Sequence, residues 1–394
     1  MTTLAPLGPR PSFWRSTRGR RFLYQSVAAA ALLLLLAWFV SRALTLDLSL
    51  DFMRQRTGFA ISNQWLTDFS SSDARWVAYA AGVFNTVRLV FVGIVLATLL
   101  GVVMGVARLS SNWLVARIAT VYVETVRNTP LLVQIVFWYS VVLLELPRIS
   151  RGVALLDVVY ISNRGLALPW PTERGEGTLL LPWLVAALAA AVFAWWLRRR
   201  RLREEADTGR STHANAFALG SFLVLAAGAY LATGLPVGIE APDLVVTGNT
   251  QAYAGGLTVT PEFAALLFAL VVYTASFITE IVRGSIQALP LGQGEAAAAL
   301  GLSSYQRMSL VILPQALRTM IPAVTNQYLN LTKNSSLAVA IGYSEFFSLS
   351  QTIVNNAGHA VPLFTVIIAT YMVLNLVISA VMNWFNRRVQ LAQI

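Results

Sequence analysis

Long uninterrupted apolar runs constrain this chain more than any other feature of its sequence. Several of them reach about 20 residues with almost no charge, which is long enough for a helix to cross a bilayer. Composition agrees, because 56% of the 394 residues are hydrophobic and only 12% are charged, against about 25% charged in soluble domains. Mean hydropathy is +0.63. We therefore predict an all-α polytopic membrane protein.

About eight runs qualify as transmembrane helices, and we place them at residues 22–40, 82–107 (or from 85), 118–146, 179–197, 216–235, 262–281, 321–343 and 361–385. The first run resembles a signal peptide in its charged start, but no small-residue cleavage site follows directly, so we expect a retained helix. Arginines cluster at the ends of the runs, as the positive-inside rule requires. The net charge of +11 thus reflects topology and not nucleic-acid binding, and both termini are expected in the cytoplasm.

A polar segment between two of these runs, residues 293–314, has the pattern of a helical hairpin. Glu295, Ala296 and Ala297 begin a run of strong helix formers, and Gly301 supplies a stop. Ser303 stands three residues before Gln306, a capping-box spacing that starts a second helix. That helix should end at Leu313, because Pro314 disfavours the α region for the residue before it. Each helix is too short to be stable alone, so a partner should hold the pair.

The run at 321–343 is unusually polar for a membrane helix. Its polar side chains include Asn326, Gln327, Asn330, Lys333 and Asn334, and spacings of three and four place the three asparagines on one face. A polar solute needs hydrogen-bonding groups at membrane depth. These amides therefore either line a substrate pathway or only join helices. For Lys333 the sequence leaves a substrate carboxylate and Glu280 open as partners.

A second polar set lies near the cytoplasmic side of two other runs. Its members are Arg127, Asn128, Thr129 and Gln134 in the run at 118–146 and Glu280 in the run at 262–281. Charges and a proline inside a helix near the membrane are costly in lipid, so these residues should face a protein interior.

The residues give little support to an enzymatic function. There is no cysteine and there are only two histidines, so a thiol or zinc centre is not indicated. No GxxxxGK[ST] phosphate loop occurs, so ATP would be hydrolysed on another chain.

Three segments resemble a known family. Glu295-Ala-Ala, Gly301 and Val311-Ile-Leu-Pro314 are similar to the EAA loop of permease subunits in bacterial ATP-binding-cassette importers. Glu124-Thr-Val-Arg-Asn-Thr-Pro-Leu-Leu-Val-Gln134 and Leu331-Thr-Lys-Asn-Ser-Ser-Leu337 resemble the polar amino-acid uptake branch. The chain departs from that branch at Asn128, where glycine is usual, and at Asn334, where aspartate is usual. A first helix and a long insertion resemble the longer permeases of general L-amino-acid transporters.

The resemblance implies a five-helix permease core with a cytoplasmic coupling helix that docks on an ATPase subunit. Glu295, Ala296, Ala297, Gly301, Leu313 and Pro314 would form the coupling loop. Further implied partners are a second, distinct permease and a periplasmic amino-acid-binding protein in the bacterial inner membrane. ATP and magnesium would bind the ATPase, so this chain would hold no cofactor and would not be an enzyme.

The same resemblance implies a division of the chain into core segments, an insertion and two tails. A cytoplasmic tail at 1–21 and an extra helix with a periplasmic loop at 22–81 precede the first part of the core at 82–146. An insertion with two extra helices at 147–260 separates it from the second part at 261–385, which holds the loop at 284–320, and a tail follows at 386–394. The alternative function is an ion-gradient-driven secondary amino-acid transporter, which predicts paired carboxylates within spans and inverted repeats. A receptor or structural membrane protein would leave the cytoplasmic loop unexplained.

Overall fold

The computed structural model describes residues 17–44, 48–61, 64, 69–155, 158–173, 180–209, 211–247 and 250–391. Residues 1–16 of the predicted N-terminal tail and residues 392–394 of the predicted C-terminal tail lie outside the described residues. The α-helices are α1 Thr17–Leu44, α2 Arg75–Arg108, α3 Trp113–Asn128, α4 Leu131–Phe137, α5 Leu180–Thr208, α6 Ala214–Ala232, α7 Pro261–Gln287, α8 Leu291–Ala299, α9 Ser304–Gln306, α10 Leu313–Asn334, α11 Phe346–Ala357 and α12 Ala360–Leu391.

Shorter helical segments and strands complete the described chain. The 3₁₀ segments are η2 Asp51–Arg54, η4 Ile149–Arg151 and η6 Ser335–Ile341, and the π-helices are η3 Trp138–Leu143 and η5 Arg307–Ile312. The strands are β1 Val153–Leu155, β2 Val159–Ser162, β3 Gly165–Leu168, β4 Trp170–Glu173, β5 Val237–Glu240, β6 Asp243–Thr247, β7 Thr250–Ala254 and β8 Leu257–Val259.

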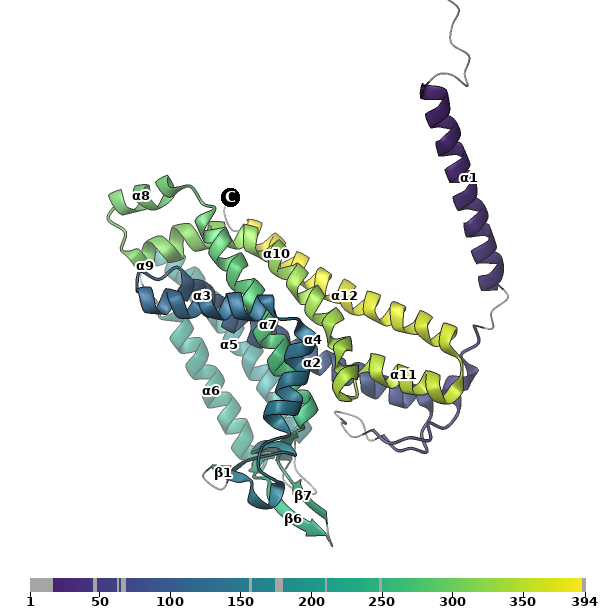
Figure 1. The fold of residues 1–394 in the computed structure, drawn as a ribbon. Helices are drawn as coiled ribbons and strands as arrows, with labels where there is room; N and C mark the ends of the chain where they lie inside the picture. The colour runs from purple at the N-terminus through teal and green to yellow at the C-terminus, as the bar shows by residue number, and fades with distance from the viewer. Residues whose placement is uncertain are drawn as a thin grey trace, which may run out of the picture.

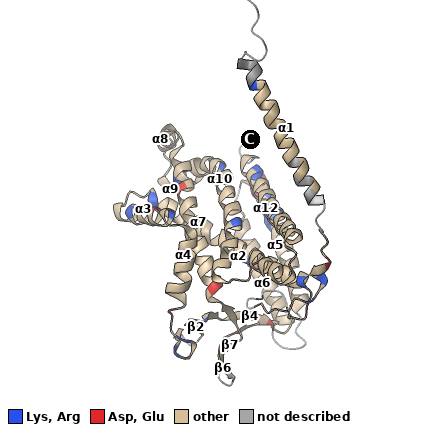
Figure 2. Ribbon diagram, turned by 45° about the vertical axis from the view of Figure 1, so that its right-hand side comes forward, with Lys and Arg blue, Asp and Glu red and all other residues tan. Residues whose placement is uncertain are grey.

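Six helices within the described ranges are long and apolar enough to cross a membrane, and a bent pair formed by α3 with α4 and η3 would make a seventh. Helix α1 contains a shorter apolar helical stretch, Arg21–Leu35, which does not meet this criterion, so the count of eight stays a prediction. Charged residues are sparse along these helices and gather toward their ends and in the connections (Figure 2). The predicted class, a polytopic helical membrane protein, is confirmed.

Helix α7 is the centre of the described core. Its apolar side chains Val271 and Ile278 pack with Ala97 of α2 and with Met320 of α10, and α12 also packs on α10. Toward the other end of α7, Leu266 and Leu270 pack with helices α2 and α4 and with segment η6. Helices α2, α4, α7, α10 and α12 thus lie together in the bundle, while α1 stands apart (Figure 1).

The predicted third span is wrong in one respect, because its polar start is not part of a continuous helix. Helix α3 ends at Asn128, and Thr129 is extended with ψ 127°. Pro130 then caps α4, and the two helices are bent by 101°. The cause is local, since proline disfavours helical backbone at the residue before it. Glu124 and Arg127 therefore lie on α3, before the bend, and not on the same straight helix as α4.

The same rule fails at Pro314, where we predicted a helix end. Leu313 has helical dihedrals, φ −60° and ψ −44°, and α10 continues directly from the π-helix η5. Proline is tolerated in the first turn of a helix, where its missing N–H removes no hydrogen bond. The π-turn ahead of it changes the hydrogen-bond register so that Pro314 occupies such a position.

Two further boundaries differ from those predicted. Helix α2 begins at Arg75, ahead of Gly82, because residues 75–81 include Ala78, Tyr79 and Ala81, which are buried against the chain. The predicted external loop at 344–360 contains α11, whose Phe346 and Leu349 pack against α2.

The insertion contains β-structure that the sequence did not predict. Strands β1, β2, β3 and β8 form one antiparallel sheet in that order, and β4–β5 and β6–β7 form two further pairs. Between them, α5 and α6 pack against each other through Ala190, Ala194, Ala214 and Ala218. The strands lie at the end of the molecule opposite α8 and the C-terminal end of α12 (Figure 1).

Candidate functional site

Helix α8 ends as its sequence predicts. Gly301 has φ +76°, which favours glycine because a Cβ is strained in the left-handed region. Its N–H donates to the Ala298 carbonyl at 2.9 Å, and the Leu302 N–H donates to the Ala297 carbonyl at 3.2 Å. These two bonds form a Schellman motif. The predicted capping box is also present, with Ser303 and Gln306 bonding each other's backbone N–H groups.

The hairpin of α8, α9 and η5, which we call the coupling hairpin, presents large apolar side chains to solvent. Leu291 is 85% exposed, and Leu300 and Tyr305 are each 80% exposed. Ala297, by contrast, is buried at 3% exposure, because α8 packs back on η5. The free surface of the hairpin is therefore formed by Leu291, Glu295, Leu300 and Tyr305, with Ala296 beside them.

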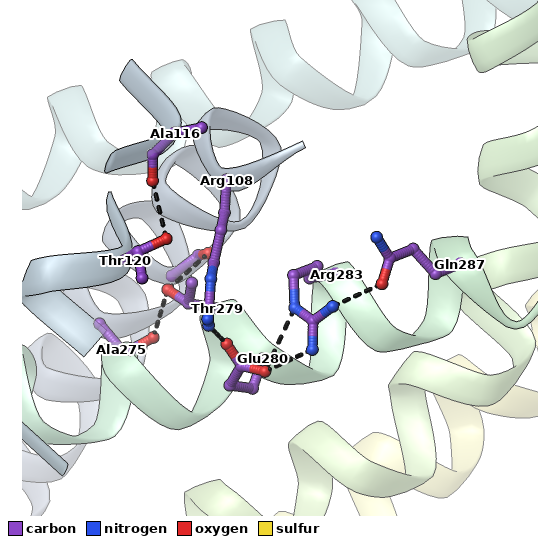
Figure 3. Close-up of polar contacts among 9 residues, drawn as sticks. Arg108, Ala116, Thr120, Ala275, Thr279, Glu280, Arg283 and Gln287 are labelled. Atoms are coloured by element: carbon purple, nitrogen blue, oxygen red, sulfur yellow. Dashed lines mark hydrogen bonds and ion pairs between the residues drawn. The ribbon is translucent and has the colours of Figure 1, made fainter. Parts of the chain in front are cut away.

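A charged cluster joins the inner ends of α2 and α7. The Glu280 carboxylate forms ion pairs with Arg108 and with Arg283, the latter at 2.9 Å. Arg283 also donates to the Gln287 side-chain oxygen at 2.5 Å. Beside the cluster, Thr279 donates from Oγ1 to the Ala275 carbonyl at 2.8 Å (Figure 3). This arrangement fixes the last turns of α7 ahead of the coupling hairpin.

Three of the predicted pathway residues do come together. Arg127, Asn128 and Glu280 line a polar cavity of about 360 Å³ between α3 and the inner ends of α2 and α7. The Arg127 guanidinium also stacks over the Phe277 ring, 4.8 Å from its centroid.

Thr129 and Gln134 have a different place, at the bend between α3 and α4. The Gln134 amide is buried and donates to the carbonyls of Val126 and Thr129, each at 2.9 Å. The Thr129 hydroxyl donates to the Thr125 carbonyl at 2.9 Å. These contacts satisfy the backbone groups that the break at Pro130 leaves open.

Helix α10 carries the predicted amide face on its outside. Asn326, Asn330 and Lys333 are exposed along one stripe, and Gln327 and Asn334 are half-buried beside it. The opposite face is buried, and its Tyr328 hydroxyl shares a 2.7 Å hydrogen bond with Thr98 of α2. Within the described ranges, Lys333 forms no ion pair and Glu280 pairs with arginines. The suggested Lys333–Glu280 contact is therefore wrong.

Two charged residues of the core were missed at the sequence level. Arg88 lies inside the apolar helix α2, half-buried, with its guanidinium 4.4 Å from the centroid of the Phe263 ring. Glu345 is fully buried and caps α11 by accepting hydrogen bonds from the N–H groups of Phe347 and Ser348, at 2.9 and 2.6 Å. Burial raises the pKa of Glu345 to about 8, although these two bonds oppose the shift. A charge inside an apolar run and an acid before an apolar helix were the available signals.

No group of three or more histidine, cysteine or acidic side chains is placed to hold a metal ion within the described residues. The candidate site consists of the polar cavity, the stripe on α10 and the coupling hairpin.

Comparison with known proteins identifies the family of this chain. Residues 97–391 match the family model of the binding-protein-dependent transport system inner membrane component. The general L-amino acid transport system permease protein AapQ of Rhizobium johnstonii is 39% identical over 381 residues, which cover 95% of this chain and 93% of that protein. The putative amino-acid ABC transporter permease protein YhdX of Escherichia coli is 36% identical, with 95% of each chain covered.

A crystal structure of an amino acid ABC transporter with histidines aligns with a TM-score of 0.46 and 20% identity, over 79% of this chain and 94% of that one. The family model extends from within α2 to the end of α12, and the full-length relatives also include the insertion. The chain belongs to the family of binding-protein-dependent transport system inner membrane components.

Proposed function

We propose that this chain is the membrane-spanning permease subunit of an ATP-driven importer that moves polar L-amino acids across the bacterial inner membrane. The observation that carries the proposal is the coupling hairpin, whose exposed Leu291, Leu300 and Tyr305 need a protein partner outside the membrane. The amino-acid range is supported by relatives of nearly full length that are named for amino-acid transport, at 39%, 36% and 35% identity.

The partners follow from this role. Two ATPase subunits would receive coupling hairpins, a second and related permease would complete the pore, and a periplasmic binding protein would deliver the amino acid. ATP and magnesium would bind the ATPase subunits, and this chain would supply no catalytic residue. Exposed apolar surface on the spans would be covered by lipid or by the second permease.

Helix α7 is the element through which we expect movement to pass. It begins at Pro261 on the side of the strands and ends at Gln287, shortly before α8. The Glu280 cluster ties its inner end to α2. A displacement of α8 by the ATPase would therefore move α7 and α2 together as one unit.

The stripe of Asn326, Asn330 and Lys333 on α10 is our candidate wall of the substrate pathway. It is exposed in the single chain, and polar groups at membrane depth need a protein or aqueous environment. We propose that it faces the second permease across the pore. Neutral amides can bond both the ammonium and the carboxylate of an amino acid, which suits solutes of differing side-chain charge.

Reconstitution tests the proposal. Proteoliposomes holding this chain, its second permease and its ATPase, with loaded binding protein outside, should accumulate tritiated L-glutamine only when ATP is enclosed. A non-hydrolysable ATP analogue and omission of the ATPase are the controls. Uptake driven by a proton or sodium gradient without ATP would contradict the importer and favour a secondary transporter.

A further inference from the structure

A second polar cavity lies at the opposite end of α7 from the coupling hairpin. Its volume is about 430 Å³, and it lies between the insertion and the permease core. The residues that line it are Tyr139, Leu144, Asn163, Arg164, Thr260, Pro261 and Glu262. We call it the outer pocket.

Backbone pairing fixes the position of the insertion in this pocket. Strand β3 pairs with β8 in the register Leu166 to Val259, and β8 runs almost directly into α7. Continuing that antiparallel register brings the turn at Asn163 and Arg164 beside Pro261 and Glu262. The approach is close, because a Cβ at Gly165 would lie 2.0 Å from the Val259 carbonyl oxygen. Only glycine fits there, so the turn is held against the start of α7.

Two side chains of opposite charge therefore line one cavity from different elements. Arg164 comes from the β2–β3 turn and is exposed, and Glu262 comes from the first turn of α7. Within the described part of the chain, no ion pair joins them. The Tyr139 hydroxyl donates to Glu262 Oε1 at 3.2 Å, and Glu262 lies in the first turn of α7.

The outer pocket thus offers a cation and an anion to a solute between them. A guanidinium binds a carboxylate through two parallel hydrogen bonds, and a carboxylate accepts from an ammonium group. The backbone of every free α-amino acid carries these two groups together. The volume lies within the range of small-molecule sites, and Leu144 and Thr260 offer a mixed surface to a side chain.

We propose that the outer pocket binds the backbone zwitterion of a free α-amino acid, with Arg164 on its carboxylate and Glu262 on its ammonium group. The insertion then contributes a binding residue to the entrance of the permease. This inference rests on the proposed function for the class of solute, but the site is separate from the stripe on α10 and from the coupling hairpin.

The test is equilibrium binding to the intact complex in nanodiscs, without ATP and without binding protein. The probes are L-glutamine, L-glutamine methyl ester, which lacks the carboxylate, and N-acetyl-L-glutamine, which lacks the ammonium group. The unmodified complex should bind glutamine about tenfold more tightly than either analogue, as expected for one charge-assisted contact. Arg164→Gln should lower glutamine affinity about tenfold and leave methyl-ester affinity unchanged.

Glu262→Gln should likewise lower glutamine affinity about tenfold and leave the affinity for N-acetyl-L-glutamine unchanged. Arg151→Gln is the matched control, because Arg151 is an exposed arginine of the insertion that does not line the pocket. It should bind all three probes like the unmodified complex.

Equal binding of glutamine and both analogues, or no binding at all, would overturn the proposal. So would an Arg164→Gln complex that keeps its glutamine affinity and loses capture of the binding protein, because the turn would then be a protein-docking surface. ATP-dependent uptake by the same complex reconstituted in proteoliposomes separates the two ideas. If uptake persists without binding at this pocket, the importer stands and only the outer pocket is rejected.

Discussion

Gly101 of α2 lies directly against Ile278 of α7. A Cβ built at Gly101 would be 2.6 Å from the Ile278 Cβ, and one at Gly105 would be 2.7 Å from the Val282 Cβ. The Thr279 hydroxyl reaches across this contact to the Gly101 carbonyl at 3.2 Å. The GxxxG spacing therefore brings two membrane helices close enough for a side chain of one to bond the backbone of the other.

The first prediction concerns this contact. Gly101→Ala should destabilise the protein by about 1–3 kcal/mol, as overpacking of a close-packed interior usually does. Thermal unfolding of the detergent-purified chain measures the effect. Gly220→Ala in α6 is the control, because its Cβ would meet nothing within 4 Å. An unchanged unfolding temperature for Gly101→Ala would mean that the two helices are not packed as described.

The second prediction concerns pH and Glu345, which lies between the spans of α10 and α12. Because its pKa is raised to about 8 in the folded chain, the folded state holds this proton more tightly than the unfolded state. Stability should therefore fall as pH rises from about 4.5 to 8 and level off above that. Glu345→Gln should remove this part of the pH dependence. The stability of the variant relative to the unmodified chain should therefore be higher at pH 8 than at pH 5.

Unfolding temperatures across pH 5–9 measure this effect for both forms. Tyr79, Tyr343 and Tyr371 lie near Glu345, and their pKa values are influenced by it, but tyrosines do not titrate in this range. Parallel pH profiles for the two forms would show that the carboxyl stays ionised in the folded protein.

The third prediction tests the stripe on α10. Asn326→Leu should lower ATP-driven uptake about tenfold while the chain still inserts and assembles, because the pathway loses a hydrogen-bonding group. Asn356→Leu is the matched control, since this exposed amide lies on α11, away from the stripe. Uptake at the unmodified level for every amino acid tested would assign Asn326 to helix contacts instead.

The fourth prediction concerns topology, which the arginine distribution motivates. An alkaline phosphatase fusion, active only in the periplasm, should be inactive after Arg203 and at the C-terminus. The same reporter placed after Gly256, in the sheet-bearing part of the insertion, should be active. Activity after Arg203 would reverse α5 and contradict the eight-span arrangement.

Local signals were sufficient for many elements of the fold. Gly301, the Ser303–Gln306 box and the end of α2 at Arg108 lie where the sequence predicts them, because each depends on nearby residues. The rule for residues before proline was also local, yet it holds at Thr129 and fails at Leu313. The difference is the π-turn before Pro314, which is a property of the folded hairpin.

Tertiary placement was beyond the sequence. Two strand pairings of the insertion, β4 with β5 and β3 with β8, join residues from opposite sides of α5 and α6 in the sequence, so no local pattern predicts them. The grouping of Arg127 and Asn128 with Glu280 depends on the 101° bend at Pro130. The sequence left Glu280 open as one partner of Lys333 by charge alone, but Glu280 pairs with Arg108 and Arg283.

The last prediction returns to the coupling hairpin, where burial separates two kinds of change. Leu300 is 80% exposed, so Leu300→Asp should leave the hairpin folded and weaken only its contact with the ATPase. Ala297 is buried on η5, and Gly301 has φ +76°. Ala297→Asp buries an unpaired charge, and Gly301→Val places a β-branched residue in the left-handed region. Both should therefore disrupt the hairpin itself.

Two measurements on the complex in lipid distinguish these effects. ATPase activity stimulated by loaded binding protein should be lost in all three variants, because each one removes the docked form of α8. Limited proteolysis should cut the hairpin faster in Ala297→Asp and Gly301→Val but not in Leu300→Asp. Leu202→Asp, the same apolar-to-acidic change at an exposed position near the end of α5, should retain full stimulation. Full stimulation in Leu300→Asp and Gly301→Val together would make the hairpin a simple connector, since neither its exposed surface nor its fold would then be needed for coupling.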